Sequence, residues 1–106
     1  MINPLWINEI IGTSLQGYVE SSFDNLVHFL GAPHYRKGHD KIDAEWRLKF
    51  ADGTIATVYN YKDGTNYLNE KGMAVEDITN WHIGGFSKKA YFKISDLVLS
   101  KRLDFN

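Results

Sequence analysis

Residues 80–89, "NWHIGGFSKK", lead from an aromatic residue, a histidine and two glycines directly into a serine and two lysines. The stretch runs from a strand-like end through two glycines to a helix start, where unpaired N–H groups can bind an anion. Either the serine and lysines after the glycines hold an anionic group, or the glycines only reverse the chain. The pattern is neither a dinucleotide-binding glycine motif nor a P-loop, which favours the structural interpretation. The candidate binding residues here are Gly84, Gly85, Ser87, Lys88 and Lys89.

His82 is the residue of this stretch best suited to proton transfer, because an imidazole titrates near neutral pH. It alternates with Trp81 and Ile83, so it should lie on the opposite face of a short strand from these apolar residues. No serine, aspartate or second histidine stands at a spacing that would complete a catalytic set with it. We therefore expect hydrogen bonding at a strand edge or contact with a ligand or partner, and a hydrolase centred on His82 is the weakest hypothesis.

Two loops hold the remaining candidates. In residues 63–72, Tyr67 and its neighbour Asn66 are the better candidates for an exposed contact with a ligand or partner. Residues 34–41 contain two histidines and an aspartate, but a bound metal needs three or four ligands in fixed geometry. The basic residues of the same loop oppose a cation. We therefore expect no metal and no cofactor.

Composition narrows the class of protein. The chain has 106 residues, of which 43% are hydrophobic, and a formal net charge of −1. That length fits a single domain, residues 1–106, and that charge lacks the basic excess of a nucleic-acid binder. The absence of cysteine rules out disulfides, thiolate metal sites and a cysteine nucleophile. Without a signal-peptide pattern or a long apolar run, we expect a cytoplasmic protein that does not enter a membrane.

Hydrophobic periodicity predicts the elements that position these residues. Residues 42–61 predict a β-hairpin, because the first half alternates apolar and polar residues up to an Asp-Gly pair. A two-residue turn at that pair places Tyr59 opposite Trp46. In this register Tyr59 and Tyr61 both belong to the apolar face, whereas Glu45 lies on the solvated face.

The whole pattern predicts an α+β fold in a single domain. We expect an antiparallel sheet of three to four strands, centred on the 42–61 hairpin, with two main helices packed on one face. The C-terminal segment favours a single helix on length, although its first part alone reads as a strand. The other elements expected are helices over 21–30 and 87–103, a short helix over 3–12, a strand over 13–20 with an irregularity at Gly17, and a polar loop over 34–41.

Several sequence blocks resemble a family of small, mostly uncharacterised proteins encoded by bacteriophages and prophages. The blocks are "GTSLQGYV", "LGAP", "DKIDAEW", "DGTIATVYNYK" and "NWHIGG", in this order over residues 11–86. The resemblance carries over no catalytic residues. It implies a context, since small phage proteins outside the virion genes often block a host defence system or redirect a host enzyme.

Two functions therefore remain open. The first is a non-enzymatic, phage-encoded interaction protein that inhibits a host defence protein in the host cytoplasm. The alternative is a binder or sequestering protein for a small phosphorylated ligand, such as a nucleotide signal, at the turn of residues 84–89. Neither hypothesis involves extended nucleic-acid binding or a membrane, and a homodimer stays open.

Overall fold

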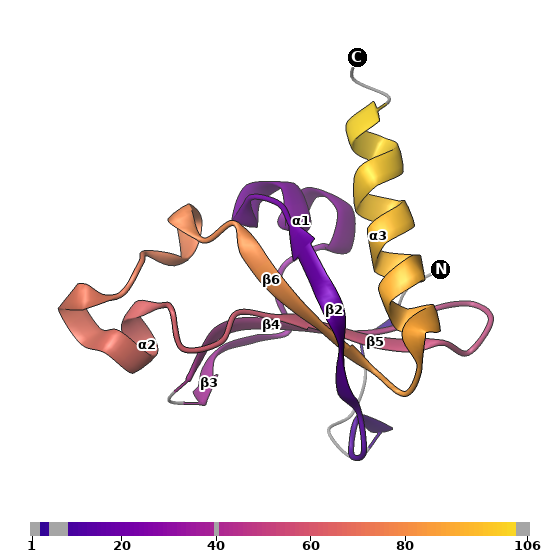
Figure 1. Cartoon of the computed structure of the whole chain (residues 1–106), viewed down its shortest axis with the longest axis horizontal. Coiled ribbons are helices and arrows are strands. Elements are labelled where there is room, and N and C mark those ends of the chain that lie inside the picture. The colour runs from indigo at the N-terminus through magenta and orange to yellow at the C-terminus, as the bar shows by residue number, and fades with distance from the viewer. Residues whose placement is uncertain (1–2, 5–8, 40, 104–106) are drawn as a thin grey trace.

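Six strands and two main helices make up the described part of the chain, which comprises residues 3–4, 9–39 and 41–103 of the computed structural model. The α+β class is as predicted, but the antiparallel sheet has six strands rather than three or four. In chain order the elements are β1 (Asn3–Pro4), β2 (Ser14–Glu20), α1 (Phe23–Leu30), β3 (Tyr35–His39), β4 (Ile42–Lys49), β5 (Ile55–Tyr59), α2 (Thr65–Leu68), two 3₁₀ turns (Asn69–Lys71 and Val75–Asp77), β6 (Asn80–Gly85) and α3 (Lys88–Leu103). Helices α1 and α3 lie on the same side of β4 and β5 (Figure 1).

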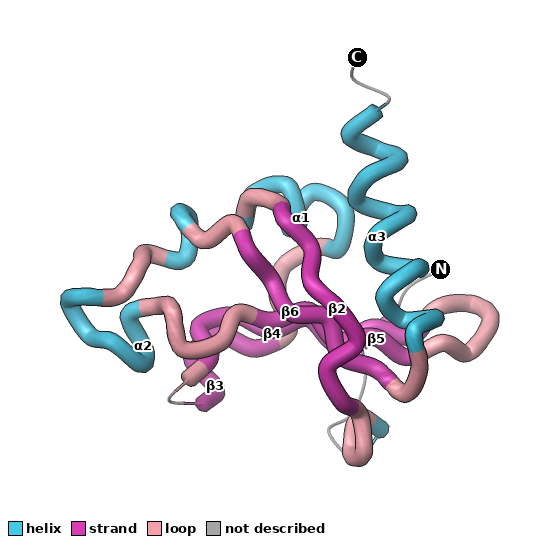
Figure 2. Tube along the Cα trace, in the orientation of Figure 1, coloured by secondary structure: helices cyan, strands magenta, loops and turns pink. Residues whose placement is uncertain are grey.

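The strands pair in the order β1-β4-β5-β6-β2, and every pairing is antiparallel. β3 also pairs with β4, on the same edge as β1 but along a different part of the strand. The connection between β5 and β6 contains α2 and the 3₁₀ turns, and it extends away from α3 (Figure 2). β4, β5 and β6 therefore each have neighbouring strands on both edges.

Two tryptophans form the centre of the core between the sheet and the helices. The rings of Trp46 on β4 and Trp81 on β6 are fully buried with their centroids 5.5 Å apart. Phe23 at the start of α1 packs against both rings, at 5.8 and 6.3 Å. The indole N–H of Trp46 donates to the carbonyl of Gly31 at 2.8 Å, and that of Trp81 donates to the carbonyl of Ser21 at 2.9 Å. Both ends of α1 are thus hydrogen-bonded to the sheet.

The predicted hairpin of β4 and β5 forms, but its turn is one residue longer than expected. The N–H of Phe50 donates to the carbonyl of Thr54 at 2.8 Å, across a loop of three residues. Gly53 has a φ of 90°, the left-handed conformation that closes three-residue hairpin loops. As a result Tyr59 pairs with Glu45.

This one-residue difference moves side chains to the other face of the sheet, because side chains alternate along a strand. The buried apolar residues of β5 are Ala56 and Val58. The predicted placement of Tyr59 and Tyr61 on the apolar face is therefore wrong. The prediction of a solvated Glu45 is also wrong, since Glu45 is only 6% exposed.

Both main helices are confirmed, together with their capping residues. The Ser22 hydroxyl accepts the N–H of Asn25 at 3.0 Å, and Gly31 ends α1. The C-terminal segment forms one helix, α3, in which the Ser87 hydroxyl accepts the N–H of Lys89 at 3.3 Å. No helix within the described ranges is long and apolar enough to cross a membrane. The buried stripe of α3 consists of Ala90, Ile94 and Val98.

β2 confirms the strand predicted over residues 13–20 and the irregularity at Gly17. The pairing with β6 shifts between Leu15 and Gly17, which is a β-bulge. Across this bulge Leu15 is 47% exposed while Val19 is buried. Glycine is required at position 17 because a side chain there would overlap the ring of Tyr91 on α3.

Two segments beside β4 differ from the prediction. Asn3–Pro4, expected to begin a short helix, form β1 instead, and residues 5–8 of that expected helix lie outside the described residues. A proline is tolerated there because an edge strand leaves one row of N–H groups unpaired. The expected polar loop over 34–41 contains β3, while Asp40 lies outside the described residues.

We predict that Trp46→Ala lowers the free energy of unfolding by about 3–5 kcal/mol, because it removes a fully buried ring from the core. Urea unfolding at neutral pH measures the change. The matched control is Phe92→Ala on α3, whose ring is 58% exposed and whose loss should change stability by no more than about 0.5 kcal/mol. Equal losses in the two variants would contradict the assigned core.

Candidate functional site

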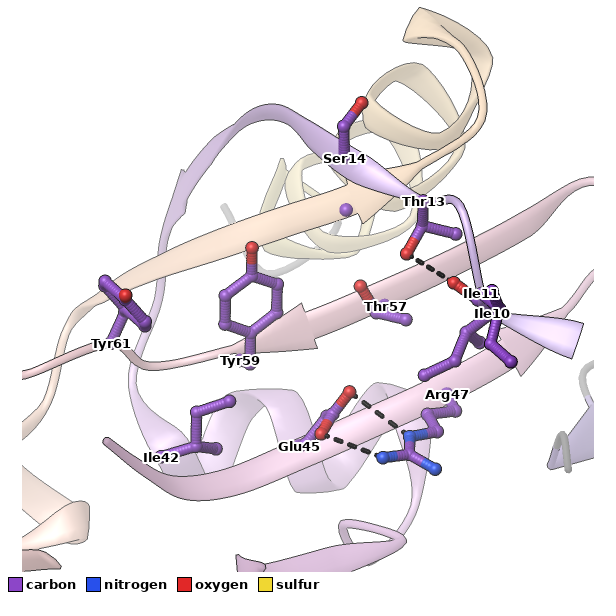
Figure 3. A pocket seen from close by; sticks show the side chains of 11 residues that line it. Ile10, Ile11, Thr13, Ser14, Ile42, Glu45, Arg47, Thr57, Tyr59 and Tyr61 are labelled. Carbon is purple, nitrogen blue, oxygen red and sulfur yellow. Dashed lines mark hydrogen bonds and ion pairs between the residues drawn. The ribbon is translucent and has the colours of Figure 1, made fainter. Parts of the chain in front are cut away.

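The face of the sheet opposite α1 and α3 carries polar side chains from three adjacent strands. We call it the polar face. The register that buries Trp46 and Trp81 against the helices directs their neighbours along the strands to this side. Figure 3 shows this region with its side chains drawn as sticks. The polar face consists of Asp43, Glu45 and Arg47 on β4, Thr57 and Tyr59 on β5, and His82 and Gly84 on β6.

A buried ion pair lies on this face. The Nε of Arg47 donates to Oε2 of Glu45 at 3.2 Å, and its Nη2 donates to Oε1 at 3.4 Å. The two side chains are only 3% and 8% exposed. The ring of Tyr35 on β3 lies against the guanidinium, with its centroid 3.7 Å from the Cζ of Arg47. The third guanidinium nitrogen, Nη1 of Arg47, is buried and has no hydrogen-bond partner among the described residues.

A pocket of about 360 Å³ lies over this ion pair. Arg47 and Glu45 line it from β4, next to Tyr59 from β5. Ile10 and Ile11, which precede β2 in the chain, line it from the other side (Figure 3). The pocket thus combines apolar and aromatic walls with one buried ion pair, a combination typical of small-ligand sites.

A row of tyrosines continues from the pocket across the polar face. Around the His82 ring lie the rings of Tyr18 at 4.9 Å and Tyr61 at 5.7 Å. The Lys62 ammonium lies between the rings of Tyr61 and Tyr67, at 5.3 and 5.7 Å. The three tyrosines are 52%, 41% and 41% exposed, in the order Tyr18, Tyr61, Tyr67. We call this set, Tyr18, His82, Tyr61, Lys62 and Tyr67, the tyrosine strip.

His82 occupies the middle of this strip rather than a sheet edge, because β6 has a neighbouring strand on each side. Its predicted separation from buried Trp81 and Ile83 is confirmed. Burial lowers the pKa of His82, while the negative charge of Asp63 acts in the opposite direction. The ring is therefore mainly neutral at pH 7, and its closest described contacts are aromatic.

The loop that presents Tyr67 is anchored by a buried carboxylate. Asp43, on the same predicted solvated face as Glu45, is only 2% exposed, so that placement is wrong as well. Its carboxylate accepts the amide of Asn60 at 3.0 Å and the backbone N–H of Asn66 at 3.2 Å. The Asn66 side chain also donates to the carbonyl of Ile42 at 3.0 Å. Asn66 therefore holds the loop against β4.

The turn of residues 84–89 lies at the junction of β6 and α3, and its side chains contact the rest of the fold. A side chain at position 85 would overlap Ala90, so Gly85 allows α3 to approach the sheet. The Lys88 ammonium donates to the carbonyl of Gln16 at 2.6 Å, and that of Lys89 lies 3.3 Å from the Asp52 carboxylate. These contacts provide a structural role for both lysines. The structure brings His82 and Tyr67 into one strip and leaves Ser87, Lys88 and Lys89 apart from it.

Neither a metal centre nor a known relative identifies the site. Within the described ranges, no three or more His, Cys, Asp or Glu side chains are grouped so as to hold a metal ion. His34 of the predicted histidine loop is used structurally, since its Nδ1 accepts the N–H of Arg47 at 2.8 Å. The chain matches no protein-family model, no curated protein and no solved structure.

We predict that Glu45→Ala lowers the free energy of unfolding by about 3–5 kcal/mol, because it leaves the Arg47 guanidinium buried without a counter-charge. The double variant Glu45→Leu with Arg47→Met removes both charges and should be more stable than the single variant. Urea unfolding of the three proteins measures both differences. A single variant within about 0.5 kcal/mol of wild type would mean that the pair is solvated.

We also predict a pH dependence of stability. Burial lowers the pKa of His82, and burial together with the Arg47 charge lowers the pKa of His34. The unfolded chain then binds protons on these residues more readily than the folded protein. Stability should be full above pH about 6.5 and should fall as the pH drops below it. Urea unfolding between pH 8 and 5 measures this slope, and an unchanged slope in His82→Gln would contradict the contribution of His82.

Proposed function

We propose that this protein is a non-enzymatic binding protein that docks a protein partner through the tyrosine strip. The observation that carries the proposal is the row of contacts from Tyr18 through His82 to Tyr61, which Lys62 extends to Tyr67. The three tyrosines expose roughly half of their surface. The residues of the strip come from β2, from β6 and from the connection between β5 and β6. The sheet therefore holds them in one row.

The chemistry of the strip favours a protein as the occupant. Tyrosine offers a large apolar ring and a hydroxyl at a small entropic cost, and it is enriched at the centres of protein interfaces. Hydrogen bonds to the Asp43 carboxylate fix the loop that carries Tyr67, which lowers the cost of ordering it on binding. A nucleic acid fits less well, because the chain has a net charge of −1 and the strip contains a single cationic side chain, Lys62.

The acid and base groups of the polar face support binding rather than catalysis. The Asp43 carboxylate accepts hydrogen bonds from Asn60 and from the loop, and both oxygens of Glu45 accept from Arg47. A general acid or base needs a substrate proton within reach, and these carboxylates are already engaged in hydrogen bonds within the fold. The lysines of the 84–89 turn are likewise engaged, so an anionic ligand at that turn has less support.

The resemblance to bacteriophage-encoded proteins supports a host protein as the partner. When a partner binds the strip, the surface of the partner that contacts the tyrosines is no longer accessible to other molecules. Inhibition of a host defence protein is therefore the finer hypothesis, and it depends on the same docking surface.

Photo-crosslinking tests the docking surface directly. p-Benzoylphenylalanine at position 61 or 67 should form an adduct with one and the same bacterial protein. The same group at Phe92, exposed on α3 on the other side of the sheet, should not form that adduct. Adducts at position 92 but not at 61 or 67 would place the interface elsewhere.

Affinity measurements with the captured partner then test whether the tyrosines of the strip contribute to binding. The double variant Tyr18→Ser with Tyr61→Ser should weaken binding by about 30-fold or more, since a few aromatic residues at an interface centre provide most of the binding free energy. Phe92→Ser should bind like wild type. Unchanged affinity in the tyrosine variant would overturn the proposal.

A further inference from the structure

We propose that the pocket over the Glu45–Arg47 pair is a second binding site, which takes a small uncharged ring compound carrying a carbonyl oxygen. The observation that points to a ligand is Nη1 of Arg47, which belongs to a side chain only 3% exposed and has no hydrogen-bond partner among the described residues. This site goes beyond the protein-docking surface, because it takes a small molecule on the part of the polar face beside the exposed strip and shares only Tyr61 with that strip.

The unpaired donor defines the first requirement of the ligand. Buried polar groups in folded proteins nearly always have a hydrogen-bond partner, and an exception in a pocket wall marks a position for a ligand atom. Arginine only donates hydrogen bonds, so the atom that completes Arg47 is an acceptor. A carbonyl oxygen supplies two lone pairs in the plane that a guanidinium N–H approaches.

The ion pair defines the second requirement, which is the absence of charge. Glu45 already neutralises Arg47, and both side chains are almost completely removed from water. An anionic ligand would add an unbalanced charge to this site, and the burial of such a charge is strongly unfavourable. A neutral carbonyl compound satisfies Nη1 and leaves the net charge of the site at zero.

The walls define the shape of the ligand. The pocket of about 360 Å³ lies at the lower end of the range for small-molecule sites. The rings of Tyr59 and Tyr61 and the side chains of Ile10 and Ile11 offer apolar surface, while Gly84 adds no side chain to the floor. Burial raises the pKa of Tyr59, with Glu45 acting in the same direction, so its hydroxyl stays protonated and available to a polar substituent.

Three matched probes test the proposal by amide chemical-shift titration of the whole chain. Benzamide carries a neutral carbonyl on a ring, benzoate carries the same ring with a charge, and toluene has no acceptor. We expect benzamide to shift the amides of Thr57 and Gly84 and to show nuclear Overhauser contacts to the Tyr59 ring. Toluene should bind at least about tenfold more weakly, the loss expected for one hydrogen bond to a charged group. Benzoate should also bind more weakly than benzamide, because its charge would be unbalanced beside the neutral Glu45–Arg47 pair.

Variants identify the contact. The double variant Glu45→Gln with Arg47→Met keeps the site uncharged, and it should weaken benzamide binding by at least about tenfold while amide dispersion reports an intact fold. Tyr67→Ala, outside the pocket, should bind benzamide like wild type even where it loses the protein partner. Preference for benzoate would overturn the uncharged class. Equal binding of all three probes, or no contact to Tyr59 in the wild-type protein, would overturn the site.

Discussion

Two indole hydrogen bonds determine how the sheet and the first helix are joined. Trp46 and Trp81 stand on strands separated by β5, yet their rings meet, and each donates its N–H to a carbonyl at one end of α1. An indole N–H buried without a partner is costly, so the two acceptors at Ser21 and Gly31 fix the position of α1 over the sheet. They also fix which face of β4 and β6 is buried against helices. The opposite side chains are thereby assigned to the polar face.

The three-residue loop between β4 and β5 completes this assignment. With Trp46 fixed in the core, a two-residue turn would bring Tyr59 to the apolar face, whereas the observed loop pairs Tyr59 with Glu45. The helix-side face then keeps the small residues Ala56 and Val58, which leave room for the indole rings. The same register places Tyr59 on the polar face, where it lines the pocket. The local turn and the global packing therefore agree on one register.

The sequence predicted the elements with strong periodicity and missed those that depend on a neighbour. Residues 21–30 have a cap, an apolar stripe and a terminal glycine, so α1 was predictable. β1 and β3 lack alternation and form by pairing with β4, which no local pattern reveals. The Asp-Gly pair fits either loop length, so the register could not be read from it. Among the site residues, His82 was predictable because it alternates with two apolar residues, and Tyr67 was predictable because it lies in a polar loop. The burial of the Glu45–Arg47 pair was not predictable, because charged residues that alternate with apolar ones along a strand ordinarily face solvent.

The two proposed sites share one residue, and this has a physical consequence. Tyr61 lines the pocket and also belongs to the exposed strip. A ligand in the pocket restricts the Tyr61 ring, and a protein on the strip restricts the same ring. The first of the two to bind changes the conformational entropy that the Tyr61 ring still has to lose when the second binds. Each binding event therefore changes the affinity of the other by the same factor. If the ligand-held orientation of Tyr61 is the one that the partner contacts, the coupling is positive, and if the orientations differ it is negative. The buried Arg47, which is not part of the strip, would then influence partner binding through a single aromatic ring.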